Sequence, residues 1–132
     1  MRFLSLYKTI ETGVPPSAEE MARMGRLVEE GMKAGYLLAV EGCMPSASGV
    51  RVRRSGGKVS VTDGPFVETK EVVGGLAIIK AGSKQEAMDI ARRFLGEAGE
   101  GECELRQLYD GGDCAQHAAE RSSAGKVEPV NG

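Results

Sequence analysis

The sequence predicts an α+β fold in which two helices cover one face of a small β-sheet. Apolar residues recur with helical spacing in two segments, they alternate or run together with strand spacing in several others, and the two kinds of segment follow in a regular order. The chain of 132 residues is long enough for one hydrophobic core and short for two. We therefore expect one domain over residues 1–110, followed by a flexible tail over 111–132.

The first part of the chain is typical of a β-α-β unit. Residues 2–8 form a short apolar and aromatic run that suits a strand. Ser17, with Glu20 three residues later, predicts a capping box, and the apolar residues that follow trace one helical stripe, which Gly35 ends. Residues 36–41 then form a second apolar strand.

A β-hairpin is predicted next. Valines alternate with polar residues over 50–53 and again over 59–62, and Gly56-Gly57 between them supplies a turn with positive φ. One face of this hairpin is therefore apolar and the other polar.

The second part repeats the β-α-β order. Residues 72–80 form an apolar strand, Ser83 with Glu86 repeats the capping box before a helix that Gly96 ends, and residues 103–109 form the last strand. Two β-α-β units with an inserted hairpin make a ferredoxin-like α+β sandwich.

Two helices can cover only one face of such a sheet. The other face would carry apolar residues from three strands, namely Phe3 or Leu4, Leu38 or Val40, and Ile78 or Ile79. The simplest cover is the same face of a second copy related by a twofold axis. We therefore expect a homodimer in which two sheets face each other.

Charge and hydropathy narrow the classes of partner. The formal net charge is −2, from 19 acidic and 17 basic residues mixed along the chain. This balance argues against nucleic acid or an anionic membrane as the main partner. No apolar run approaches the length of a membrane span and no leader pattern follows Met1, so we expect a cytoplasmic protein.

The cysteine pattern and the glycine pattern indicate no metal or cofactor. The three cysteines, Cys43, Cys103 and Cys114, form no C-x-x-C pair, and Cys114 with His117 would give a metal only two ligands in the tail. Neither a dinucleotide-binding turn nor a phosphate loop follows a predicted strand.

The segment 61–71 is not explained by secondary structure alone. Asp63 can bond the amides that follow it, Gly64 tolerates positive φ and Pro65 fixes φ, so the segment predicts a rigid turn. Three charged residues come next: Glu68, Lys70 and Glu71.

This part of the chain reads Val-Thr-Asp-Gly-Pro-Phe at 61–66, Glu-Thr-Lys-Glu at 68–71 and Gly-Gly at 74–75. It resembles the signature of the DGPF family, which belongs to the YCII-related proteins. Further agreement occurs at Glu41-Gly42 with Pro45, at Val50-Arg51 and at Glu104-Leu105-Arg106, so the resemblance covers about residues 1–109. It implies a dimeric α+β barrel built from ferredoxin-like protomers.

The resemblance also implies two kinds of function. Related YCII proteins are suspected of enzymatic activity from a His and Asp pair in a cleft, and some DGPF members accompany alternative sigma factors. The only histidine of this chain, His117, lies outside the matched region, so the pair is not carried over.

The loop residues each have a functional and a structural interpretation. Asp63 is either a general base or polar anchor in a pocket, or the cap of its own turn. Phe66 either lines a ligand pocket or fills the core. The charged residues are either solvated, or Lys70 binds a carboxylate or phosphate while a neighbouring carboxylate acts as acid or base.

Our favoured hypothesis is a homodimer that binds a small polar or anionic molecule in a cleft beside the Asp63 loop, with acid-base chemistry on Asp63 and Glu68. The expected binding residues are at strand ends and in the loop: Tyr7, Glu41, Gly42, Phe66, Lys70 and Glu71. The alternative is a non-catalytic interaction module that docks on a regulatory protein such as a sigma factor through the tail.

Overall fold

The computed structural model describes residues 1–110. The tail predicted over 111–132, with Cys114 and His117, lies outside the described residues. In chain order the elements are β1 (Arg2–Thr9), α1 (Ala18–Ala34), β2 (Leu37–Gly42), the 3₁₀ turn η1 (Ser46–Ser48), β3 (Val50–Ser55), β4 (Lys58–Asp63), β5 (Val72–Lys80), α2 (Lys84–Ala98) and β6 (Glu102–Gln107). The predicted order of helices and strands is confirmed.

Capping residues set the ends of α1. The Ser17 hydroxyl accepts a hydrogen bond from the Glu20 amide, and the Glu20 carboxylate accepts one from the Ser17 amide, each at 3.1 Å. Gly35 ends the helix at φ 84°, where its amide bonds carbonyls of the last turn. The predicted capping box and terminating glycine are both confirmed.

Two predictions for α2 are wrong in detail. Only one half of a capping box forms, in which the Ser83 hydroxyl accepts from the Glu86 amide at 3.1 Å. The helix also continues through Gly96 and ends at Gly99, whose φ is 93°. A glycine within a helix costs only about 1 kcal/mol relative to alanine. Packing of the turn that follows Gly96 can offset this cost, so the helix continues past the glycine.

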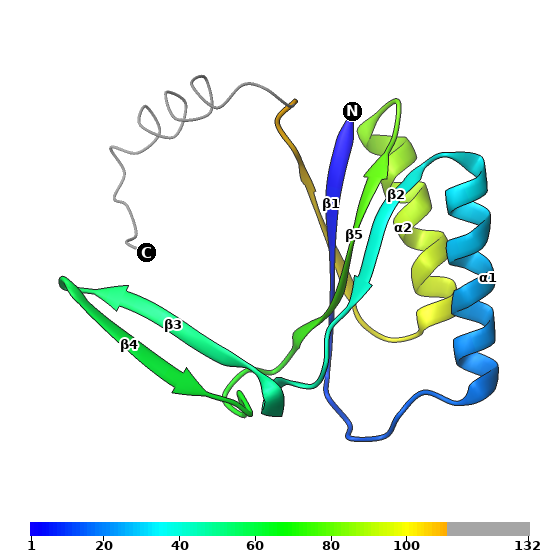
Figure 1. Cartoon of the computed structure of the whole chain (residues 1–132). Coiled ribbons are helices and arrows are strands. Elements are labelled where there is room, and N and C mark those ends of the chain that lie inside the picture. The colour runs from blue at the N-terminus through cyan, green and yellow to red at the C-terminus, as the bar shows by residue number, and fades with distance from the viewer. Residues whose placement is uncertain (111–132) are drawn as a thin grey trace.

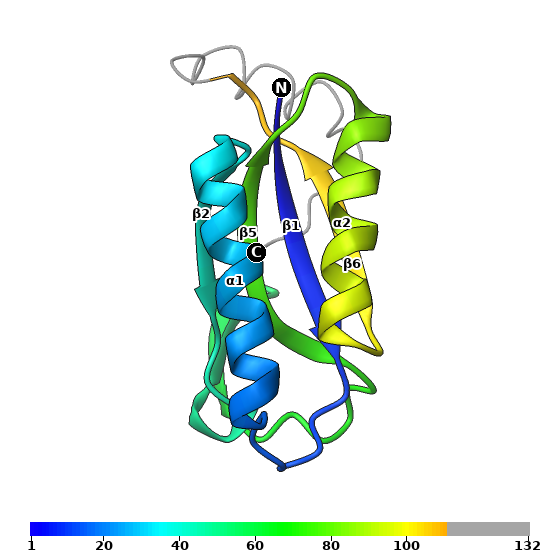
Figure 2. The ribbon, with the colours of Figure 1, turned by 90° about the vertical axis from the view of Figure 1, so that its right-hand side faces the viewer.

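Four antiparallel strands form one sheet in the order β2-β5-β1-β6, and β3 pairs with β4 in a separate hairpin. Figures 1 and 2 show both helices on the same side of the sheet. This mixed α+β arrangement is consistent with the predicted ferredoxin-like sandwich.

Strand register decides which apolar residues lie under the helices. Phe3 pairs with Ile79, and both side chains are buried with Ala81 and Ala87 of the core. Because side chains alternate along a strand, the neighbouring pairs lie on the opposite face, which we call the open face. Its apolar pairs are Leu4 with Ile78 and Leu6 with Leu76.

The hairpin β3–β4, which we call the arm, extends from the sheet on the side away from the helices (Figure 1). The pairing of Val52 with Val61 and of Arg54 with Val59 places the valines on one face of the arm. The exposed fractions of Val50, Val52, Val59 and Val61 are 52%, 66%, 65% and 63%. The predicted apolar face therefore exists and is uncovered in the protomer.

Candidate functional site

A cavity of about 560 Å³ lies between the helix layer and the sheet. Its floor is made of small residues from β1 and β5: Ser5, Gly74, Gly75 and Ala77. Its walls are largely apolar side chains of the two helices: Met21, Met24, Leu27, Val28, Ile90, Ala91 and Phe94. The volume is in the range of small-molecule pockets, about 300–1,000 Å³.

Three of the predicted binding residues, Tyr7, Glu41 and Gly42, line this cavity. The Tyr7 ring meets Phe94 of α2 edge to face, with centroids 5.2 Å apart and planes at 80°. Its hydroxyl donates a hydrogen bond of 2.9 Å to the Glu100 carbonyl. These two contacts hold the Tyr7 ring in place at the end of the cavity near the C-terminus of α2.

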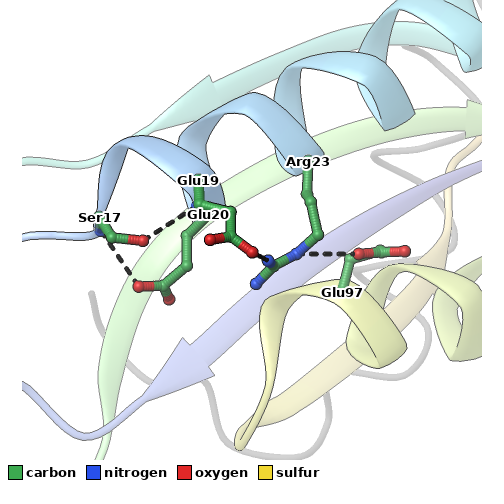
Figure 3. A network of polar contacts seen from close by, with 5 residues as sticks. All are labelled: Ser17, Glu19, Glu20, Arg23 and Glu97. Atoms are coloured by element: carbon green, nitrogen blue, oxygen red, sulfur yellow. Dashed lines mark hydrogen bonds and ion pairs between the residues drawn. The ribbon is translucent and has the colours of Figure 1, made fainter.

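A polar network joins the two helices at the same end of the cavity (Figure 3). The Arg23 guanidinium lies 3.4 Å from the Glu97 carboxylate of α2 and 3.2 Å from Glu19 on its own helix. Farther along α1, Glu30 forms a second interhelical ion pair with Arg93. The helices are therefore tied by exposed ion pairs, each of which contributes little, up to about 1 kcal/mol.

Arg51 organises the loop that follows the arm. Its guanidinium carbon lies 3.8 Å from the centroid of the Phe66 ring, and the same group pairs with Glu68 and donates to the Thr69 hydroxyl at 2.8 Å. A backbone amide bond, followed by the Arg51 contact, lowers the pKa of Glu68. Arg51 thus holds the Glu68 carboxylate beside the Phe66 ring.

Ser46 joins this loop to the β1–α1 connection. Its amide and hydroxyl both donate to the Glu11 carboxylate at 2.6 Å, and its hydroxyl accepts from the Phe66 amide at 3.2 Å. These bonds lower the pKa of Glu11. The sequence analysis did not single out Ser46 or Glu11, because no sequence pattern links two residues that are 35 positions apart.

Gly64 has a steric reason to be glycine rather than the conformational one that we predicted. Its φ is not among the positive values of this chain. A Cβ at this position would lie 1.7 Å from the Ser46 carbonyl oxygen, so the close approach of two backbones excludes any side chain. The Gly64–Pro65 peptide is cis.

A charged cluster lies at one end of the open face. Lys8 pairs with Glu104 at 2.5 Å, and Arg106 contacts the same carboxylate at 3.3 Å. The hydrogen bond with Glu104 raises the pKa of Lys8 and lowers that of Glu104, and Glu71 and Glu102 add weaker attraction to Lys8. The predicted residue Glu71 therefore belongs to this cluster.

The predicted site residues divide among several places. Tyr7, Glu41 and Gly42 line the helix-side cavity, and Phe66 and Glu68 surround Arg51. Asp63 and Lys70 are exposed. Within residues 1–110, no group of three His, Cys, Asp or Glu side chains is placed to hold a metal ion.

No helix in the described part of the chain is long and apolar enough to cross a membrane.

The fold and these sites define a small α+β protein with a helix-covered sheet, an open sheet face and a projecting arm. Residues 1–108 match the family model of the YCII-related domain, so the chain belongs to that family, as the sequence predicted. It is 41% identical over 61 residues to an uncharacterized protein of Rhizobium meliloti (strain 1021). That match covers 46% of this chain and 49% of the relative, so it spans about half of each.

Proposed function

We propose that this DGPF-type member of the family is a homodimer that binds a small polar or anionic molecule in a cleft between subunits, beside the 63–71 loop. The observations that support the proposal are that the helices cover only one side of the sheet, with the apolar side chains of the open face only part-buried, and that the valine face of the arm is exposed. In the proposed dimer the open faces meet, and each arm lies against the partner.

The open face has the composition of a subunit interface. Its centre carries Leu4, Leu6, Leu76 and Ile78, with charged residues at the edge. These side chains are part-buried in the protomer, and a twofold pairing would remove their remaining apolar area from water at about 25 cal/mol per Å², which favours association.

Charge complementarity supports a position for the arm on the partner. The arm carries four basic residues and one acidic residue: Arg51, Arg53, Arg54, Lys58 and Asp63. The end of the open face is rich in carboxylates: Glu71, Glu102 and Glu104. Of these basic residues only Arg54 shares the valine face with Val52 and Val61, so Arg54 is the residue that can meet the carboxylates if the valine face lies on the partner.

The proposed binding position is the charged end of the open face. Lys8 is paired there with Glu104, so an anionic group would have to displace that carboxylate, whereas the carboxylates around Lys8 can accept hydrogen bonds from hydroxyl or amine groups. Asp63, exposed at the base of the arm, is the carboxylate that this arrangement leaves to act as a base, because Glu68 is paired with Arg51.

The oligomeric state is measured by sedimentation velocity at micromolar concentration. A double variant, Val52→Lys with Val61→Lys, puts charge on the valine face and should shift a dimer toward monomer. Ser60→Lys adds a charge on the opposite face of the arm and serves as the matched control. A monomeric wild-type protein would overturn the proposal.

Ligand binding is tested by thermal shift with a panel of small carboxylic acids, phosphates and polyols. Compounds that stabilise the wild type should lose their effect in Lys8→Met, while Lys80→Met, an exposed lysine at the far end of the sheet, should respond normally. An equal response in Lys8→Met would rule out this site.

The sigma-factor alternative rests on the family resemblance, and its expected docking segment, 111–132, lies outside the described residues. Retention of a bound sigma factor by the whole chain, and its loss from a 1–110 fragment, would favour the interaction module.

A further inference from the structure

We infer that each protomer binds a second kind of ligand, a small amphipathic molecule with an apolar body and a neutral or cationic head, in the cavity between its helices and its sheet. This site lies on the opposite side of the sheet from the open face. It therefore does not depend on the dimer.

The cavity exists because the packed core occupies only one end of the sandwich. Phe3 near the start of β1, Ile79 near the end of β5 and Ala87 early in α2 form the core at that end. Toward the other end of β1, the sheet presents the small side chains of Ser5 and Ala77, which pair across β1 and β5. Void space remains where larger side chains would continue the core.

Close strand packing keeps the floor of the cavity free of side chains. A Cβ on Gly75 would lie 2.9 Å from the Glu41 carbonyl oxygen, and one on Gly74 would lie 3.3 Å from the Thr9 methyl group. Glycine at position 75 therefore follows from a backbone contact and glycine at position 74 from a tight side-chain contact, and both leave the floor of the cavity without side chains.

The helix walls suit a flexible apolar ligand. Met21 and Met24 contribute unbranched, polarizable side chains that adapt to different shapes, and Phe94 supplies an aromatic surface. Met21 is 61% exposed, which places it at the opening of the cavity rather than in a closed interior. An apolar body can thus enter past Met21 and contact Phe94.

The polar lining selects the head group. The ionisable lining residues are carboxylates or tyrosines: Tyr7, Glu20, Tyr36, Glu41 and Glu97. Glu41 pairs with Leu76 on the open-face side of β2, so Glu20 and Glu97 supply the carboxylates at the helix ends. Among residues 1–110, no lysine, arginine or histidine belongs to this lining. Arg23 nearby pairs with Glu19 and Glu97, so the three carboxylates Glu19, Glu20 and Glu97 outnumber the one guanidinium and leave this end of the cavity with a net negative charge. An amine or hydroxyl is therefore favoured over a carboxylate.

Three probes with one chain length and different heads test this selection: decylamine, decanol and decanoate, each below its micelle concentration. Isothermal calorimetry on the whole protein should show one site per protomer for decylamine and decanol, and at least about tenfold weaker binding of decanoate. Absence of binding by both decylamine and decanol, or decanoate binding as tight as decylamine, would overturn the inference.

Cavity-filling variants locate the site. Ala77→Leu projects from the floor into the void and should abolish probe binding, whereas Ala22→Leu on the exposed face of α1 should leave it unchanged. If Ala77→Leu does not fold, Ser5→Val serves as the second floor variant: Ser5 pairs with Ala77 on the neighbouring strand, and a valine there should also reduce probe binding. Unchanged binding in the folded floor variants would exclude the cavity. The arm variant with Val52→Lys and Val61→Lys should still bind decylamine, which separates this inference from the proposed dimer.

Discussion

Arg51 lies over the Phe66 ring at 3.8 Å, and this contact joins the arm to the loop that the sequence singles out. The same guanidinium also pairs with Glu68 and Thr69, so one side chain on β3 holds three residues of the loop. The loop is therefore positioned mainly by a residue outside it.

Replacing Arg51 should loosen this loop without unfolding the domain. Arg51→Lys keeps the charge but loses the planar group that stacks on Phe66 and reaches two partners, so we expect a loss of about 1 kcal/mol in the free energy of unfolding. Chemical denaturation measures the loss, and hydrogen exchange at the Thr69 amide should speed up. Arg53→Lys, on the same face of the arm, is the control. Equal effects of the two variants would contradict the assignment.

Gly64→Ala should be strongly destabilising, because its Cβ would overlap the Ser46 carbonyl oxygen. We expect a loss of about 3 kcal/mol, as for other substitutions that force backbone movement. Gly42→Ala meets no atom within 4 Å and provides the control. A thermal melt of Gly64→Ala close to that of Gly42→Ala would show that the loop moves aside at little cost.

Glu11→Gln should make stability less dependent on pH. Hydrogen bonds from Ser46 lower the pKa of Glu11 in the folded protein below its ordinary value of 4.5. The contribution of these bonds to the free energy of unfolding is therefore present above pH 4.5 and is lost as the pH falls through the lowered folded pKa. The difference in unfolding free energy between wild type and Glu11→Gln should therefore be largest near neutral pH and shrink in acid. Urea denaturation at several pH values measures it, with Glu19→Gln as a surface control. A difference that grows in acid would have the wrong sign.

Removing the two helix caps should have unequal effects. Ser17→Ala breaks a complete capping box, whereas Ser83→Ala removes a single cap bond. We expect a loss of about 1 kcal/mol for Ser17→Ala and less for Ser83→Ala, with Ser60→Ala near zero. Urea denaturation at neutral pH provides the comparison. If Ser83→Ala were the more damaging, the second bond of the capping box at α1 would have no stabilising role.

The sequence by itself determined what depends on neighbours along the chain. The α1 cap at Ser17, its end at Gly35, the arm turn at Gly56-Gly57 and the order of strands and helices all follow from local conformational preferences and apolar spacing. Local preference gave a wrong helix end at Gly96. A glycine can end a helix, but α2 continues to Ala98 because packing of the next turn offsets the cost of the glycine.

Tertiary structure decided which residues meet. Strand register placed Phe3 under the helices and Leu4 on the open face, a choice that the apolar run of β1 left undecided. Glu11 reaches Ser46, and small residues from β1 and β5 combine to leave a cavity, through contacts between segments far apart in sequence. Such contacts depend on volumes and distances summed over several elements, and no single segment carries that information.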